Sequence, residues 1–386
     1  MLKSKSQRGF TLLELLVASM IGLTVILIMT SLFKVGMDAT FRVTQRAETQ
    51  QNLRAAIELM TKDISLAGGG LPSGGLQLVT GGTVSLFGCN QTGTCYVPGG
   101  TYPQSGAGVN NYMYGIIPGF SNGVQNNTVI AAAPGQINSS VTSIYCDYNF
   151  PLNNFTFTFP TNASANVAVI NAGVTPNNIL APGGLNVGDL ILFTVSTPGN
   201  GKTQSGTSLV QNAAVVAEVT GIPNNTSMAF AAADALNFNQ LGGGIANNLA
   251  TVAAAAAGAG AQTSACRLNA VSYFLQVPAA GGTVQTPRLM RQVNGLDAVP
   301  VADNIINLQF TYDVIDSTTG TVVANQQDPI GAGESPSLIQ KVNVWIMASS
   351  LLSNGNKSQN MYLATSVSLR DMSFCNSYSS SATVCQ

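Results

Sequence analysis

The stretch Gly9-Phe10-Thr11-Leu12-Leu13-Glu14 separates a short basic leader from a long apolar run. The leader carries Lys3, Lys5 and Arg8. No ionisable side chain occurs from Leu15 to Phe33, and a run of that length can span a bilayer. Glu14 therefore places one carboxylate at the start of a membrane-length helix. A charge is costly there, which indicates that this residue has a function.

Two simpler interpretations of this region explain less. A secretory signal peptide has an apolar core of about 7–15 residues that ends at small residues, whereas the uncharged run here is longer and begins only after Glu14. A plain signal anchor accounts for the basic leader through the positive-inside bias. It does not account for a carboxylate that closely follows a Gly-Phe junction.

Residues 9–18 resemble the leader junction of type IV prepilins and type II secretion pseudopilins. In that family a membrane-embedded aspartyl peptidase cuts after the glycine and methylates the new N-terminal amine. The resemblance implies cleavage between Gly9 and Phe10, with N-methylation of Phe10. It also implies that Glu14 is recognised during processing and pairs with the N-terminal amine of a neighbouring subunit. An opposite charge makes a buried carboxylate tolerable, so the physics agrees with that pairing.

The composition favours an extracytoplasmic surface built of neutral hydrogen-bonding groups. Only 8% of the 386 residues are charged, against about 25% in ordinary soluble proteins. The net charge is −1 for the whole chain, and it falls to near −4 when Lys3, Lys5 and Arg8 are removed. This balance does not favour broad binding to a phosphate backbone, so nucleic acid is not expected as a partner.

The ionisable side chains and cysteines favour a structural protein over an enzyme. Histidine is absent, which removes the commonest general base and the commonest metal ligand. We expect no catalytic residues, no metal and no cofactor.

Six cysteines follow the apolar run, and an even number there favours periplasmic disulfides. Fifteen pairings are possible. The arrangement along the chain favours Cys89–Cys95 and Cys375–Cys385, which leaves Cys146–Cys266.

A single helix is predicted from Phe10 to about Ala67, roughly 87 Å long at 1.5 Å per residue. Leu53, Ile57, Met60 and Ile64 form a helical stripe that should pack on a globular domain. Glycines 68–70 should end the helix. The predicted domains are a cleaved leader at 1–9, a transmembrane or filament-core helix at 10–36, its amphipathic continuation at 37–67, and an extracytoplasmic β-rich domain at 68–386 with a variable insertion at about 71–265.

The globular part shows short apolar runs separated by Gly, Asn and Pro, which is typical of strands and long loops. Residues 241–265, rich in Gly and Ala, predict either a flexible loop or a short helix. The predicted fold class is α+β: a pilin-like arrangement in which the long helix packs on an antiparallel sheet. The predicted strands are 128–132, 143–148, 155–159, 189–195, 213–220, 271–277, 306–315, 341–348 and 363–369.

The C-terminal third adds to the resemblance. The order of its segments is similar to that of PilW-like minor pilins and the related J-type minor pseudopilins, and the helix segment 53–64 also fits that group. The matching C-terminal segments are 271–275, 288–291, 300–313, 339–348 and 365–370.

This resemblance implies a minor pilin that primes assembly of a type IV pilus and sits in its tip complex. The implied partners are other minor pilins, the major pilin and the prepilin peptidase, with a large tip adhesin as a further candidate. The implied location is the bacterial inner membrane as a single-pass protein with a periplasmic C-terminal domain, and then the extracellular pilus. Two alternatives stay open: a type II secretion minor pseudopilin, and a pilus-borne adhesin or DNA-uptake component.

Overall fold

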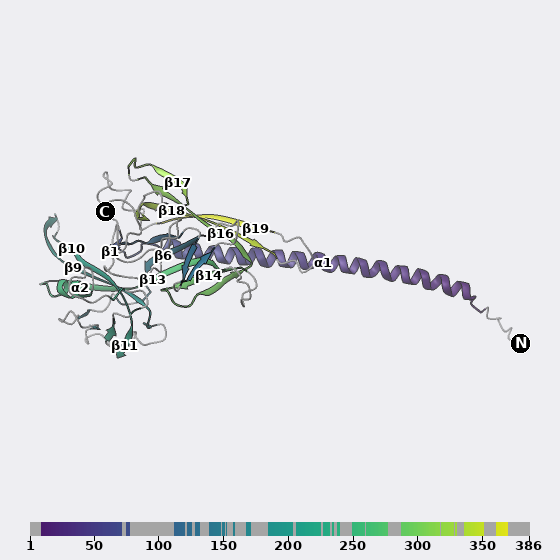
Figure 1. Ribbon diagram of the computed structural model, residues 1–386, viewed down its shortest axis with the longest axis horizontal. Helices are drawn as coiled ribbons and strands as arrows, with labels where there is room; N and C mark the ends of the chain where they lie inside the picture. Colours follow the sequence, from purple (N-terminus) through teal and green to yellow (C-terminus); the bar gives the residue numbers. More distant parts are fainter. Residues whose placement is uncertain are drawn as a thin grey trace.

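A computed structural model shows a β-rich head from which one long helix projects (Figure 1). The helix α1, Leu12–Ser65, runs without interruption, and the N-terminus lies at its free end. At 1.5 Å per residue its length is about 80 Å. The structure describes residues 9–71, 75–77, 112–119, 122–125, 128–131, 139–147, 149–150, 152, 157–158, 167–170, 184–203, 206–224, 227–231, 234, 238–239, 249–258, 260–276, 287–316, 318–327, 329, 336–350 and 360–369.

The predicted stop of α1 is confirmed, with the last helical residue two positions earlier than expected. Leu66 caps the helix, and the following turn places Gly68 and Gly70 at φ values of 85° and 78°. Such positive φ angles favour glycine. The Gly68 amide donates to the Ile144 carbonyl (2.9 Å), and the Cys146 amide donates to the Gly69 carbonyl (2.7 Å). The turn therefore ties the end of α1 to the sheet.

The largest sheet is antiparallel and is organised around β13. One edge of β13 pairs with β6, while its other edge pairs with β9 over residues 262–268 and with β14 over 271–276. From these neighbours the sheet continues to β3, β10 and β15. The strands are β3 (Ile116–Gly119), β6 (Ser140–Cys146), β9 (Leu190–Thr203), β10 (Gly206–Glu218), β13 (Gln262–Gln276), β14 (Arg288–Val293) and β15 (Val299–Asp303).

Asn294 bridges the place where β13 changes partner from β9 to β14. Its Nδ2 donates to the Leu268 carbonyl (3.1 Å), and its Oδ1 accepts from the Ala270 amide (2.8 Å). Its own amide donates to the Ala270 carbonyl (2.8 Å). Asn294 has a φ of 51°, a left-handed conformation that asparagine tolerates better than most residues. The side chain thus continues the hydrogen bonding where strand pairing is interrupted.

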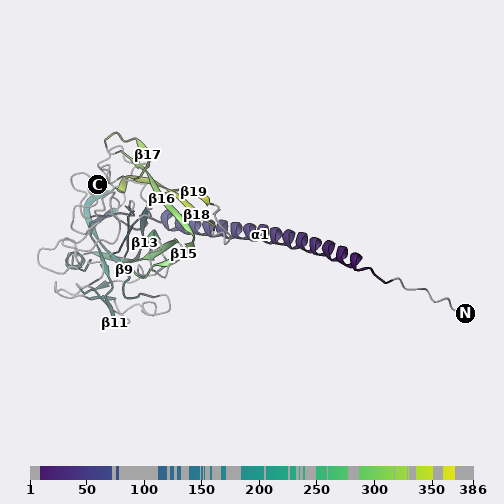
Figure 2. The same cartoon turned by 45° about the vertical axis from the view of Figure 1, so that its right-hand side comes forward.

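A second antiparallel sheet has the order β17-β16-β18-β19 and lies beside the C-terminal part of α1 (Figure 2). Its strands are β16 (Ile305–Ile315), β17 (Val322–Gln326), β18 (Ile339–Ser349) and β19 (Asn360–Ser368). Buried and partly exposed residues alternate strictly along most of β16 and β18. This period-2 pattern gives the sheet one core face and one outward face.

The main core lies between α1 and these two sheets. The predicted stripe is confirmed: Leu53, Met60 and Ile64 are at most 2% exposed, and Ile57 is partly buried against the same core. The sheets contribute buried residues such as Tyr273 and Phe310. Because this core joins residues from both ends of the chain, the head needs the C-terminal third in order to hold α1.

A second core lies farther from α1, where α2 (Leu249–Ala256) packs on β9 and β10. This helix confirms one of the two predictions for residues 241–265, since 249–256 are helical and β13 begins at Gln262. Residues 241–248 lie outside the described part. The smaller strands are β1 (Leu76–Gln77), β2 (Tyr112–Met113), β4 (Asn122–Gln125), β5 (Thr128–Ala131), β7 (Phe157–Thr158), β8 (Val167–Ile170), β11 (Gly221–Asn224) and β12 (Ser227–Ala229).

The predicted α+β class is confirmed, and every predicted strand range overlaps an observed strand. The main differences lie in length. The sequence patterns predicted 189–195 and 213–220, but β9 and β10 extend toward each other as a long hairpin paired from Leu190↔Glu218 to Thr203↔Gly206. Main-chain pairing carries these strands through Gly- and Pro-containing segments that lack a β-rich composition.

Candidate functional site

The N-terminal junction lies at the free end of α1. Gly9 and Phe10 precede the helix in exposed, non-helical backbone, and Phe10 is 88% exposed. The helix begins at Leu12 instead of the expected Phe10, because Thr11 adopts the extended N-cap conformation (φ −79°, ψ 149°). The peptide bond between Gly9 and Phe10 is therefore open to solvent and free of helical hydrogen bonding.

Glu14 forms a capping box with Thr11. The Glu14 amide donates to Thr11 Oγ1 (3.3 Å), and the Thr11 amide donates to Glu14 Oε2 (3.1 Å). The Thr11 hydroxyl also donates to Oε2, at 3.0 Å. This arrangement satisfies amides that a helix start leaves unpaired. Both bonds to the Glu14 carboxylate use Oε2, and within the described part of the chain Oε1 has no hydrogen-bond partner.

Gly9 is not required by the packing of this chain. A Cβ atom placed on Gly9 would meet no heavy atom within 4 Å, and the backbone there does not have a positive φ. Alanine would therefore fit at this position without strain. A requirement for glycine at position 9 would have to arise from another molecule, such as an enzyme that binds the junction closely.

The first half of α1 presents an apolar surface on all sides. Every residue from 11 to 44 is exposed. The helix is long and apolar enough to cross a membrane, and none of its most apolar window is buried by the rest of the described chain. This is consistent with membrane anchoring. The large apolar side chains exposed along this half include Leu12, Leu13, Leu15, Leu16, Ile21, Leu23, Ile26, Leu27, Ile28, Met29, Leu32 and Phe33.

The other end of α1 is held in the head through Asp63, which is only 3% exposed. Its Oδ1 accepts from the hydroxyl of Tyr145 on β6 (2.8 Å). Its Oδ2 accepts from the hydroxyl of Tyr273 on β13 (2.6 Å) and from Nε of Arg291 on β14 (2.8 Å). One helical carboxylate thus joins three adjacent strands of the large sheet. Asp63, Tyr145, Tyr273 and Arg291 are called the Asp63 cluster below.

The Asp63 cluster holds a buried negative charge with a positive partner and two neutral donors. Arg291 balances the charge, and its side chain keeps 28% of its surface exposed. Burial, and then the nearby Asp63 carboxylate, raise the pKa of both tyrosine hydroxyls above 10.0. The tyrosines therefore stay protonated and act as donors. Sequence patterns did not identify this cluster, although a carboxylate three residues after Met60 falls on the core-facing stripe.

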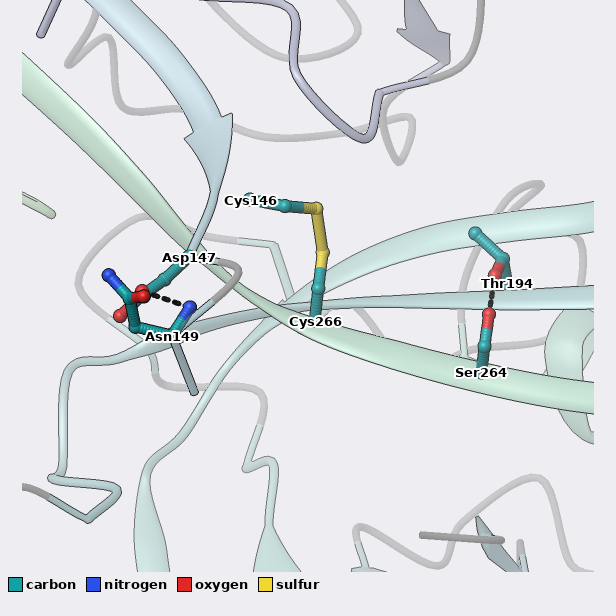
Figure 3. The surroundings of a disulfide bond; sticks show 6 residues. All are labelled: Cys146, Asp147, Asn149, Thr194, Ser264 and Cys266. Atoms are coloured by element: carbon teal, nitrogen blue, oxygen red, sulfur yellow. Dashed lines mark hydrogen bonds between the residues drawn. A yellow bond between two sulfur atoms is a disulfide. The ribbon is translucent and has the colours of Figure 1, made fainter. Parts of the chain in front are cut away.

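The end of β6 is linked to β13 by a disulfide between Cys146 and Cys266, whose Cα atoms are 5.7 Å apart (Figure 3). Beside it, Arg267 Nε donates to Asp147 Oδ2 at 3.2 Å, and the guanidinium lies 4.4 Å from the ring centre of Phe150. These contacts join the end of β6 and the segment that follows it to β13. The expected pairs Cys89–Cys95 and Cys375–Cys385 lie outside the described residues.

Comparison with known proteins gives one match. A family model described as the prokaryotic N-terminal methylation motif matches residues 4–30. No curated protein and no solved structure matches the chain. The match covers the leader junction and much of the exposed apolar half of α1, and it supports a type IV prepilin-like protein. Proteins of this kind are generally structural and not enzymatic.

Proposed function

We propose that this chain is a minor pilin of a type IV pilus, which sits in a tip complex and primes assembly. Before assembly, α1 anchors it in the inner membrane with the head in the periplasm. It then joins other minor pilins and the major pilin, and its final location is the extracellular pilus. Its role is structural, and it works through contacts with other subunits.

The observation that carries this proposal is the fully exposed first half of α1. A helix that is apolar on every side is expected to be buried in lipid or among other proteins. Here the chain's own head leaves that half uncovered, and the methylation motif begins at its free end. Lipid would cover the surface before assembly, and the helices of neighbouring subunits would cover it afterwards.

Processing fits the geometry of the junction. A prepilin peptidase would cut between Gly9 and Phe10 and methylate the new amine of Phe10. Glu14 Oε2 is held by Thr11, and Oε1 remains able to accept from the amine of a neighbouring subunit. Pairing of the two charges would make both tolerable in an apolar environment.

Mass spectrometry of the protein from wild-type cells tests the processing step. The expected N-terminus is N-methylated Phe10, and recovery of intact Met1 would overturn the proposal. Gly9→Ala provides a sharp variant, because the added methyl group meets no atom of this chain. It should preserve the fold while blocking cleavage, and cells that lack the peptidase should give the same uncleaved product.

Deletion of the gene tests the place of the protein in a pilus. Loss of surface pili, with protein secretion retained and pili restored by the intact gene, is the expected result. Loss of secretion with normal pili would instead identify a type II secretion minor pseudopilin. A pull-down with labelled DNA checks the DNA-uptake alternative, and no binding at moderate salt is expected.

A further inference from the structure

The outward face of the second sheet contains a groove of about 540 Å³ around Trp345. This is the single tryptophan of the chain, and it is partly exposed. The groove lies on the face opposite the core that holds α1, since Val344 and Ile346, which flank Trp345 along β18, point into that core. It is therefore separate from α1 and its exposed apolar half.

Strand register explains why the face is hollow at this point. Trp345 on β18 lies between Gln309 on β16 and Ala364 on β19. The next outward row places Asn343 between Thr311 and Ser366. Because β19 contributes only the small side chains of Ala364 and Ser366, one side of the tryptophan is left uncovered.

A hydrogen-bond network holds the side-chain amides of Asn325 and Asn343 beside Trp345. Asp313 Oδ1 accepts from Asn343 Nδ2 and from the backbone amide of Asn325, both at 3.0 Å. Asn325 Oδ1 accepts from Asn343 Nδ2 (3.2 Å) and from the Thr311 hydroxyl (3.3 Å). Asn325 also has a φ of 59°, a left-handed conformation that asparagine tolerates better than most residues.

This network leaves hydrogen-bonding groups available to a ligand. A carboxylate can only accept, so the atom of Asn343 that faces Asp313 must be Nδ2, and Oδ1 remains available. Within the described part of the chain, the indole N–H of Trp345 and the side-chain amide of Gln309 also make no hydrogen bond. Donors and acceptors are therefore arranged around one exposed aromatic ring.

We propose that the Trp345 groove binds a neutral carbohydrate. A sugar ring has an apolar C–H face, which can lie on the indole, and a rim of hydroxyls that both donate and accept hydrogen bonds. The described residues that line the groove carry no ionisable side chain. A phosphate backbone would require Lys or Arg there.

The single tryptophan allows a direct test with the full-length mature protein. The protein is held in a detergent without a sugar headgroup and titrated with neutral oligosaccharides of glucose, galactose and N-acetylglucosamine. Emission from Trp345 should shift to shorter wavelength and become protected from acrylamide quenching with at least one of these probes. No change with any of them, or a change only with an acidic oligosaccharide or an oligonucleotide, overturns the proposal.

Matched variants locate the binding. Trp345→Ala removes the platform, and Ser366→Phe fills the hollow from an exposed position. Each should weaken binding, measured by calorimetry, by at least about tenfold. Ser368→Phe adds the same ring two residues along β19, outside the groove, and should change affinity by no more than about twofold. Wild-type affinity in both groove variants, with unchanged circular dichroism, overturns the assignment. Neither result depends on the proposed role in a pilus.

Discussion

The two halves of α1 use apolar side chains in opposite ways. In the first half, Leu12 is 83% exposed and Met29 is 66% exposed. In the second half, Leu53 is 2% exposed and Met60 is fully buried. A single continuous helix therefore places one apolar surface outside the protein and another inside its core.

This difference shows that the pattern of apolar residues is more informative than their number. The first half is apolar all round, so no single face can be covered by one head domain. The second half has a narrow stripe of apolar residues, and this stripe packs into the core between the two sheets. Asp63 lies near the C-terminal end of the stripe. Changes in the second half should therefore affect folding of the head, whereas changes in the first half should affect only contacts with lipid or other subunits.

Asp63→Ala should cause the largest loss of head stability. It leaves the hydroxyls of Tyr145 and Tyr273 without their acceptor and Arg291 without its counter-charge. We expect the free energy of unfolding to fall by about 4 kcal/mol. Asp38→Ala, an exposed carboxylate in the same helix, should change it by less than about 0.5 kcal/mol. Urea unfolding followed through Trp345 fluorescence measures the free energy of unfolding of both variants. Equal losses would contradict the claim that only the second half of α1 stabilises the head.

A pair of methionine substitutions tests the same division through apolar contacts alone. Met60→Ala should lower the free energy of unfolding by about 3 kcal/mol, because it removes buried methylene groups and leaves a cavity. Met29→Ala removes the same atoms from an exposed position and should change head stability by less than about 0.5 kcal/mol. Thermal unfolding of the two variants in detergent compares them, and a large loss from Met29→Ala would show that the first half also packs on the head.

Alkaline pH should weaken the attachment of α1 by a smaller amount. The folded-state pKa of Tyr145 and of Tyr273 is raised above 10.0, so stability is fully present below that value and is lost as pH rises beyond it. At pH 11 each of the two tyrosines should lower the free energy of unfolding by about 1 kcal/mol, because its hydroxyl has lost a proton in the unfolded state and keeps it in the folded state.

Urea midpoints at pH 8 and pH 11 measure this effect. Tyr145→Phe should reduce the difference between the two midpoints. Tyr362→Phe should leave it unchanged, because the Tyr362 side chain is 73% exposed in the folded protein. The same difference in the wild-type protein and in Tyr145→Phe would show that the buried hydroxyl does not control the response.

Much of α1 could be predicted because its signals are local. The glycine turn and the stripe from Leu53 to Ile64 are periodic or adjacent in sequence, and both agree with the structure. The predicted start at Phe10 follows from the interpretation of the junction as a cleavage site. The pattern of Thr11 followed three residues later by Glu14 is itself a capping-box signature, and it would have given the observed start.

The Asp63 cluster and the Trp345 groove could not be predicted because their residues meet only after folding. Tyr145, Tyr273 and Arg291 lie 82, 210 and 228 residues after Asp63 in the chain. The groove depends on the register of β16, β18 and β19, in which one residue of slip would move Trp345 to the core face. Composition and periodicity predict that strands exist, but they do not determine which outward side chains become neighbours.

Substitution of Glu14 should have the smallest effect on the head and a large effect on assembly. Glu14→Ala removes the capping box at a helix start that is far from any buried residue of the head, so the free energy of unfolding should change by less than about 0.5 kcal/mol. If Glu14 pairs with the amine of a neighbouring subunit in a pilus, its loss should nevertheless reduce incorporation by at least about tenfold. Immunoblots of sheared pili and of membranes measure incorporation and insertion, and insertion should be retained.

Glu14→Gln separates the two roles of this side chain, because glutamine also completes a capping box but carries no charge. If Glu14 pairs with the amine of a neighbouring subunit, Glu14→Gln should be as defective in assembly as Glu14→Ala. Normal assembly of Glu14→Gln would reduce the role of Glu14 to its bond with Thr11. Glu48→Ala, which removes an exposed carboxylate from the same helix outside the methylation motif, should assemble normally. A defect in that control would mean that α1 tolerates charge loss poorly along its whole length, and the two halves would then differ less than their exposure indicates.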